Sequence, residues 1–365
     1  MNRRSFLNAI SLAPAVTLVP PIVLARAEAN ANAALSTWPH IIYKENDGIL
    51  ADLEPAETES FVFNLLVKSE NRNIEAQGAH LEFYSSGDRA NVVELSRKTL
   101  SAVRHISISA AGDLDREDEL FDLRHYFSMP VSLNVDRLVY SLTVAGPGVS
   151  GVEKTLEIPL LRYQQKTKLV FPMKGKFMVV RGHDFNEPHS FGRSQHFAYD
   201  VFGMGPHWEI TRNGGATMAD FCTWGREVIA PADGVVVYAR NDVPDQPRPG
   251  TIDLSIHEHL PDPAYAGPGN NVLLNHGNNE YSSLGHLQHG SVRVKTGDRI
   301  KSGDVVGLAG NSNSPIPHLH YQLTNGEHLF RADGLPSRFE NTSLDLLGSP
   351  IKVATPKRGA ILEAH

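Results

Sequence analysis

The sequence predicts a mainly β protein of two domains, an N-terminal antiparallel, immunoglobulin-like β-sandwich followed by a second strand-rich domain. The length of 365 residues is more than one ordinary domain requires. A composition of 41% hydrophobic and 21% charged residues is typical of globular proteins with sizeable cores. Short runs rich in β-branched and aromatic residues recur along the chain, bounded by Gly, Asn, Asp or Pro, which is the pattern of short strands joined by turns.

The first domain is expected over residues 38–162. Several short strands at fairly regular spacing favour a sandwich there. The segment Leu95–Ile106 fits either a short helix or a further strand. The clearest strands are Ser60–Val67, His80–Tyr84 and Arg137–Val144. This half shows no set of residues typical of a catalytic or metal site. We interpret its scattered histidines as ordinary surface or core residues: His40, His80, His105 and His125.

The second domain is expected over residues 169–345, after a polar linker at 163–168. Strands with many glycines resume beyond the linker, and residues 346–365 are expected to form a loosely held tail. A Pro-rich segment at 241–269 is too long for a simple connection, and loops of that length are often functional.

Composition excludes several classes of protein. The formal net charge is −7 and the sequence pI is about 6.2, so no basic surface for nucleic acid is indicated. Cys222 is the only cysteine, which excludes an intrachain disulfide framework and a multi-cysteine zinc site. The chain has 17 histidines, many of them in its second half, and imidazole is the commonest metal-binding side chain.

Residues 1–27 are interpreted as a removable export signal. Arg3 and Arg4 precede an apolar run, and Ala25-Arg26-Ala27 offers a cleavage site; a second candidate lies after residue 33. The apolar run contains prolines and is short for a membrane span, so no permanent anchor is expected. The start resembles a twin-arginine signal, with an ordinary secretory signal as the alternative. We therefore expect export machinery as a partner and a periplasmic or secreted location.

A set of histidines with one aspartate indicates a metal site. His196 and Asp200 form an H-x-x-x-D pattern, and His318 and His320 form H-x-H before an apolar run. Residues two apart on a strand point to the same face, so His318 and His320 can project into one cavity. Two imidazoles and a carboxylate suit zinc and leave one position for water. A second H-x-H, His257-Glu258-His259, lies in the Pro-rich segment and is interpreted as solvated or substrate-facing.

Residues from about Val170 to Asn325 resemble the catalytic domain of the M23 zinc endopeptidases, the lysostaphin- or LytM-type peptidases. The resemblance rests on motifs in order along the chain: His196 with Asp200, Ala230–Val236, Asn271–Gly277, His286-Leu287, Gly297–Gly303 and Pro317–His320. It implies the family's antiparallel duplicated hybrid motif fold. It also implies that one zinc ion is bound by His196, Asp200 and His320, with His286 and His318 as catalytic residues.

The function implied is that of a zinc metalloendopeptidase. Family members commonly cut peptide crosslinks of bacterial peptidoglycan, so peptidoglycan or another peptide is the expected substrate. Because no H-E-x-x-H motif supplies a glutamate base, His286 and His318 are the expected proton handlers. One alternative is an inactive M23-like module that binds or activates cell-wall hydrolases. A lipoyl- or biotinyl-like carrier is disfavoured, since the 297–307 hairpin shows no lysine signature for attachment and a carrier would leave the histidine set unexplained.

Overall fold

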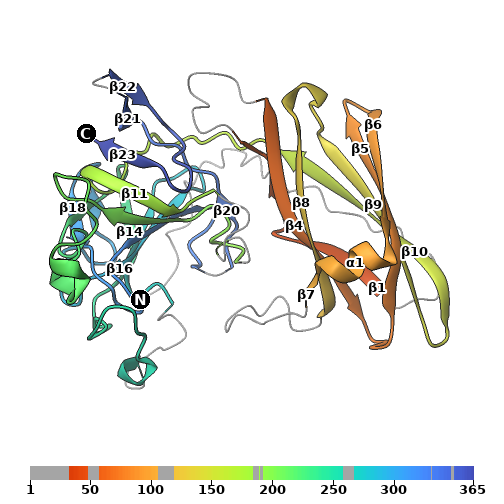
Figure 1. The fold of residues 1–365 in the computed structure, drawn as a ribbon, viewed down its shortest axis with the longest axis horizontal. Helices are drawn as coiled ribbons and strands as arrows, with labels where there is room; N and C mark the ends of the chain where they lie inside the picture. The colour runs from red at the N-terminus through yellow and green to blue at the C-terminus, as the bar shows by residue number, and fades with distance from the viewer. Residues whose placement is uncertain are drawn as a thin grey trace, which may run out of the picture.

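The computed structural model describes residues 33–47, 57–105, 119–183, 189, 192–257, 267–329, 331–346 and 349–365. The chain folds into two β-rich lobes, with the N-terminal one in red to yellow and the C-terminal one in green to blue (Figure 1). The prediction of a mainly β chain with antiparallel sheets is confirmed. The expected export signal at 1–27 lies outside the described residues. Within the described part of the chain, no helix is both long and apolar enough to cross a membrane.

The N-terminal lobe is a sandwich of two five-stranded sheets. Alternate residues of facing strands, such as Phe63 of β4 and Leu142 of β9, share one buried core, which is the burial pattern of a sandwich. One sheet comprises β1 (Ala33–Trp38), β3 (Glu45–Asn46), β4 (Thr58–Ser69), β7 (Arg104–His105) and β8 (Glu119–Pro130). The other comprises β2 (Ile42–Tyr43), β5 (Glu75–Ser85), β6 (Asp88–Ser96), β9 (Arg137–Gly146) and β10 (Val149–Leu161).

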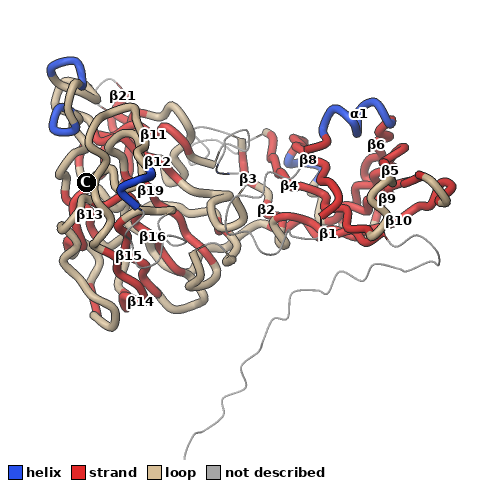
Figure 2. Tube along the Cα trace, turned by 90° about the horizontal axis from the view of Figure 1, so that it is seen from below, coloured by secondary structure: helices blue, strands red, loops and turns tan. Residues whose placement is uncertain are grey.

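A short helix, α1 (Arg97–Val103), lies within the segment that sequence left open between helix and strand. Ser96 caps it by accepting a hydrogen bond from the Thr99 backbone N–H, and Leu100 anchors it in the sandwich core. Figure 2 shows α1 at one edge of the sandwich, away from the C-terminal lobe. Short 3-10 turns lie elsewhere, at Val131–Leu133, Asn213–Gly215, Met218–Asp220 and Leu254–His257.

An eleven-stranded sheet forms the C-terminal lobe. Its path runs β17 (Arg299–Ile300), β14 (Gly234–Arg240), β15 (Asn270–Asn275), β16 (Tyr281–Leu287), β19 (Leu319–Thr324), β12 (Tyr199–Gly203), β11 (Gly175–Arg181), β23 (Ile361–Ala364), β21 (Thr342–Leu346) and β22 (Ser349–Lys352), with β20 (Gly334–Leu335) beside β19. A separate ribbon pairs β13 (Glu227–Ile229) with β18 (Val305–Leu308). The core of the C-terminal lobe holds Tyr199 and Val201 of β12 and Leu319 and Tyr321 of β19. The residues between them on each strand therefore face the opposite side of the sheet.

The prediction of a loosely held tail at 346–365 is wrong for the residues of that segment that the structure describes. β23 pairs with β11 along Gly175–Met178, and Leu362 is buried in the core. An alternating pattern of only four residues, Ile361–Ala364, was too short to indicate a strand from sequence. The first strand, β1, also begins at Ala33, before the expected domain start at Trp38.

The linker is tied to the C-terminal lobe by one buried carboxylate. Glu280 accepts hydrogen bonds of 2.7 Å from the backbone N–H groups of Lys166 and Thr167, and one from the Tyr163 hydroxyl. The two lobes also touch directly, since Phe197 packs against Val62. These contacts join the sandwich to the lobe that carries the predicted site.

Candidate metal centre

The centre is built where β12 and β19 lie side by side. Asp200 of β12 stands directly opposite His320 of β19 in the antiparallel register. Tyr199 and Val201 enter the core, so Asp200 points to the other face, and His320 points there for the same reason. On the far side of β19, Gly285 of β16 stands opposite His320 and adds no side chain to the face.

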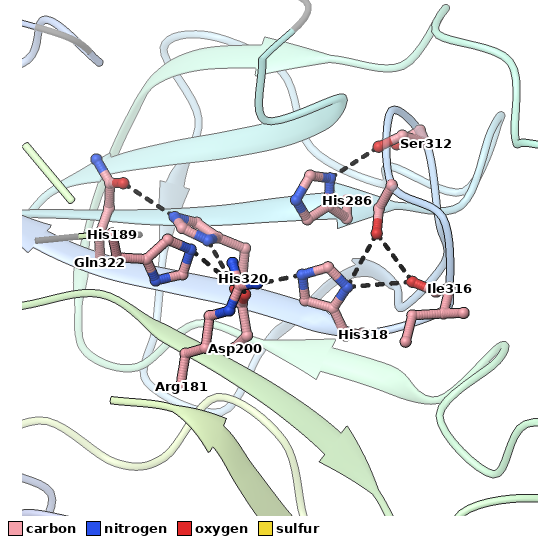
Figure 3. A network of polar contacts seen from close by, with 10 residues as sticks. Arg181, His189, Asp200, His286, Ser312, Ile316, His318, His320 and Gln322 are labelled. Atoms are coloured by element: carbon pink, nitrogen blue, oxygen red, sulfur yellow. Dashed lines mark hydrogen bonds and ion pairs between the residues drawn. The ribbon is translucent and has the colours of Figure 1, made fainter. Parts of the chain in front are cut away.

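Three buried side chains form a set that can hold a metal ion: His189, Asp200 and His320. One ligand atom from each lies within 4.8 Å of the others. His189 Nε2 is 3.3 Å from Asp200 Oδ2, and His320 Nδ1 is 2.9 Å from Asp200 Oδ1 (Figure 3). The other nitrogen of His189, Nδ1, is buried with no hydrogen-bond partner among the described residues. Two imidazoles and one carboxylate suit zinc, so this donor set fits the expected metal.

His196 does not take the place expected from the H-x-x-x-D pattern. It is buried and contacts the ring of Phe197 at 4.9 Å, but it lies outside the group formed by His189, Asp200 and His320. The reason is local backbone geometry. The chain turns through 192–198, with a hydrogen bond from the Ala198 N–H to the Gln195 carbonyl, and β12 begins only at Tyr199. The even spacing therefore does not place His196 and Asp200 on one strand face.

His286 and His318 lie beside the metal set. Their ring centroids are 4.6 Å apart, and His318 Nε2 is 3.2 Å from Asp200 Oδ1. His286 Nδ1 donates to the Ser312 carbonyl at 2.8 Å, and His318 Nδ1 donates to the Ile316 carbonyl at 3.1 Å. Because a backbone carbonyl only accepts, these contacts place a proton on Nδ1 of each ring and leave Nε2 facing the centre, where it accepts in a neutral ring and donates to Asp200 when His318 is charged. His286 also has a positive φ of 57°, a conformation that often marks functional residues.

The charges of the centre favour metal binding. Burial opposes ionisation of Asp200, but the charge of His318 and its hydrogen bond to the carboxylate outweigh it and hold the pKa of Asp200 well below its usual value. Burial lowers the pKa of His189 to about 4, and burial with the neighbouring His318 lowers that of His286 well below 6.5. Burial also acts against protonated His318, but Asp200 raises its pKa overall. At neutral pH this combination supplies an ionised carboxylate and a neutral His189, the forms that bind metal.

Two further residues complete the surroundings and were not singled out from the sequence. Gln322 Oε1 lies 3.0 Å from His320 Nε2 and accepts its proton, which leaves Nδ1 to face Asp200 and the metal position. Arg181 Nη1 lies 3.7 Å from Asp200 Oδ2. The signal for Gln322 was present, because it continues the alternation of His318 and His320 along β19. His189 carries no local motif, and only its membership of the histidine-rich half pointed to it.

Other polar candidates lie elsewhere. Asp298 and Asp304 act as turn residues, since they accept hydrogen bonds from the backbone N–H groups of Lys295 and Lys301. The side chains of His257 and His259 lie outside the described residues.

A family model for peptidase family M23 matches residues 213–331, which include His286, His318 and His320. The chain carries a peptidase M23 domain. His189 and Asp200 precede the matched residues, so the match does not bear on them. The match confirms the resemblance drawn from the motifs.

Similar proteins match parts of this chain. Endolysin 2638A of Staphylococcus phage 2638A is 41% identical over 63 residues, covering 16% of this chain and 13% of the endolysin. Peptidoglycan DD-endopeptidase ShyC of Vibrio cholerae serotype O1 is 33% identical over 106 residues, covering 28% and 21%. The chain spans only 13–21% of the length of the curated relatives it matches. A solved putative peptidase M23 from Pseudomonas aeruginosa is 13% identical, with 68% and 86% coverage and a TM-score of 0.27, too low to carry an argument.

Proposed function

We propose that this chain is a zinc metalloendopeptidase that hydrolyses peptide crosslinks of bacterial peptidoglycan. The observation that carries the proposal is the meeting of His189, Asp200 and His320 on one sheet face, with His286 and His318 beside them. This arrangement supplies three metal ligands and two proton-handling groups, which are the parts that metal-assisted peptide hydrolysis requires.

His189, Asp200 and His320 would hold the zinc ion. When bound, zinc polarises a scissile carbonyl and lowers the pKa of water at the site. The Nε2 atoms of His286 and His318 face the same space because their Nδ1 atoms are engaged by backbone carbonyls. One imidazole accepts the proton of the attacking water, and the other stabilises the developing oxyanion or donates a proton to the leaving amine.

The substrate class is supported by the similar proteins. Two Vibrio cholerae proteins of 33% identity over about 100 residues are peptidoglycan DD-endopeptidases by name.

Action on peptidoglycan requires a location outside the cytoplasm, and the twin-arginine-like start of the chain provides a route. We propose a periplasmic or secreted protein whose signal is removed. Replacing both Arg3 and Arg4 by Lys should leave unprocessed precursor inside the cell, whereas normal delivery would favour the ordinary secretory route.

The decisive experiment is digestion of purified peptidoglycan by the purified chain, with and without a chelator, followed by mass analysis of the products. We expect new amine and carboxyl ends at a crosslink, loss of activity with the chelator, and recovery with added zinc. The rival function is an inactive binding or activator module. Stoichiometric zinc without hydrolysis of any peptidoglycan, together with stimulation of another cell-wall hydrolase, would support the rival.

A further inference from the structure

Arg181 is directed to the metal centre by an irregularity in its strand. In the pairing of β11 with β12, Met178 stands opposite Phe202 and Val179 opposite Val201, but the register then shifts so that Arg181, not Val180, stands opposite Asp200. Side chains alternate between the faces of a strand, so the shift puts Arg181 on the same face as Asp200. Bulges of this kind occur beside active sites, where they redirect a side chain.

Arg181 lies between the buried centre and solvent. Its side chain is 38% exposed, whereas that of Asp200 is 11% exposed and that of His320 only 4%. In the view of Figure 3, Arg181 lies on the side of Asp200 away from His286 and His318. A substrate group that reaches the centre on that side therefore meets a guanidinium first.

The charge at this position suits an anion. The contact between Arg181 Nη1 and Asp200 Oδ2 is 3.7 Å, longer than an N–H···O hydrogen bond, so it is a charge contact. A guanidinium has five N–H donors in a planar fork that matches a carboxylate, and it keeps its charge at any physiological pH. A divalent ion bound to Asp200 and neutral histidines would make the whole cluster, Arg181 included, net positive.

We propose that Arg181 binds a free carboxylate of the substrate, on a residue that flanks the scissile bond. The proposal rests on the proposed function, because it takes the metal centre as the place of cleavage. Contact between Arg181 and the ligand Asp200 requires the recognised carboxylate to lie next to the reacting atoms. The chain would thus prefer crosslinks between residues with a free carboxylate, such as those formed through a diamino dicarboxylic acid, over crosslinks of glycine or amidated residues.

The test uses synthetic crosslinked peptide dimers that differ only in the carboxylates beside the scissile bond. One dimer carries them free, and two others have the carboxylate on one or the other flanking residue amidated. For the wild type, we expect one amidation to lower kcat/KM about 10- to 100-fold, mainly through KM, which is the worth of one charge-assisted hydrogen bond. In Arg181→Met the ratio of kcat/KM for the free dimer to kcat/KM for the amidated dimer should fall to about one. Arg181→Lys should retain part of the wild-type ratio.

Lys176 provides a matched control on the same strand. Its Nζ lies 3.0 Å from the Pro206 carbonyl and 4.1 Å from the centre of the Trp208 ring, at the other end of β11. Lys176→Met removes a cation of the same lobe and should keep the preference for the free carboxylate. Zinc content is measured for every variant.

A second measurement separates this proposal from the proposed function. Calorimetry gives the affinity of the wild type and Arg181→Met for the product peptides, free or amidated, whether or not the dimers are cleaved. Equal affinity of the wild type for both forms, or a preference that survives in Arg181→Met, would overturn the proposal. Loss of zinc from Arg181→Met would overturn it too, since Arg181 would then serve to hold Asp200. Failure to cleave any dimer, with the binding preference intact, would count against the proposed function alone.

Discussion

His189 Nε2 lies 3.3 Å from Asp200 Oδ2, while His196, only four residues before Asp200 in the sequence, lies outside the metal set. We therefore predict that His189→Ala lowers zinc affinity by more than about 100-fold, because loss of a ligand should exceed the 10- to 100-fold effect of removing an outer-shell partner. His196→Ala should leave zinc affinity within a few-fold of the wild type. Competition against a chromophoric chelator measures both. The reverse result would restore His196 as the ligand expected from the H-x-x-x-D pattern.

The two flanking histidines should affect rate and not metal content. Each holds its ring through a backbone carbonyl, Ser312 for His286 and Ile316 for His318, with Nε2 facing the centre. His286→Ala and His318→Ala should each lower kcat about 10²- to 10⁴-fold, the usual contribution of general acid–base groups, with zinc retained. Peptide hydrolysis and metal analysis of the same samples check this. An empty site in His318→Ala would instead make His318 a ligand.

Gln322 should tune the metal ligand His320. Its Oε1 accepts the Nε2 proton of His320 at 3.0 Å, so Gln322→Leu removes the group that selects the metal-binding tautomer. We expect zinc affinity to fall about 10- to 100-fold. Gln322→Glu keeps an acceptor at the same place and should retain most of the affinity. If Leu and Glu weaken zinc binding equally, loss of packing at this buried position, and not of the acceptor, is the cause.

The sequence singled out His320 because strand alternation is local, and Asp200 through the H-x-x-x-D pattern and the family resemblance. His318 directly precedes β19 and His320 lies within it, and the residues between the polar ones are apolar, which identifies the face. The family resemblance implied that Asp200 and His320 bind one metal ion, but no local pattern indicated the pairing of β12 with β19 that brings them opposite each other.

His189 and Arg181 were not predictable in the same way. The position of His189 depends on the path of the chain between β11 and β12, where turns at 192–198 also carry His196 away from a strand geometry. Arg181 reaches the metal face only through the register shift after Val179, and strict alternation from Met178 would have put it on the core side. The spacing of motifs in a sequence predicts neither the path of the chain between two strands nor a register shift at a single residue.

Glu280 should stabilise the attachment of the linker. It is fully buried and accepts hydrogen bonds from the backbone of Lys166 and Thr167. Glu280→Gln replaces one acceptor by an N–H₂ donor that must face a backbone N–H, so we expect a loss of about 1–3 kcal/mol in the free energy of unfolding of the C-terminal lobe. Urea unfolding followed by tryptophan fluorescence measures it. Glu340→Gln, at an exposed residue 3.9 Å from Lys168, is the control and should stay within about 0.5 kcal/mol of the wild type.

The sandwich should lose stability in mild acid because of His125. This side chain lies in the aromatic core, 5.2 Å from the Tyr140 ring by centroids, and burial lowers its pKa to about 4. The unfolded chain has a histidine pKa near 6.5, so between pH 6.5 and 4 the unfolded state binds more protons than the folded state. Stability is therefore complete above about pH 6.5 and decreases as the pH falls toward 4, by about 3 kcal/mol in all.

Two variants separate the titration of His125 from its hydrogen bond. The Tyr140 hydroxyl lies 2.9 Å from His125 Nε2. Tyr140→Phe removes the bond but keeps the imidazole, so it should lower stability at pH 7 and retain a slope between pH 6.5 and 4. His125→Phe removes the titrating group, so its slope should be flatter over that range even though the Tyr140 hydroxyl loses this partner. Urea midpoints of the sandwich transition at several pH values measure both, and an unchanged slope in His125→Phe would show that other groups cause the acid sensitivity.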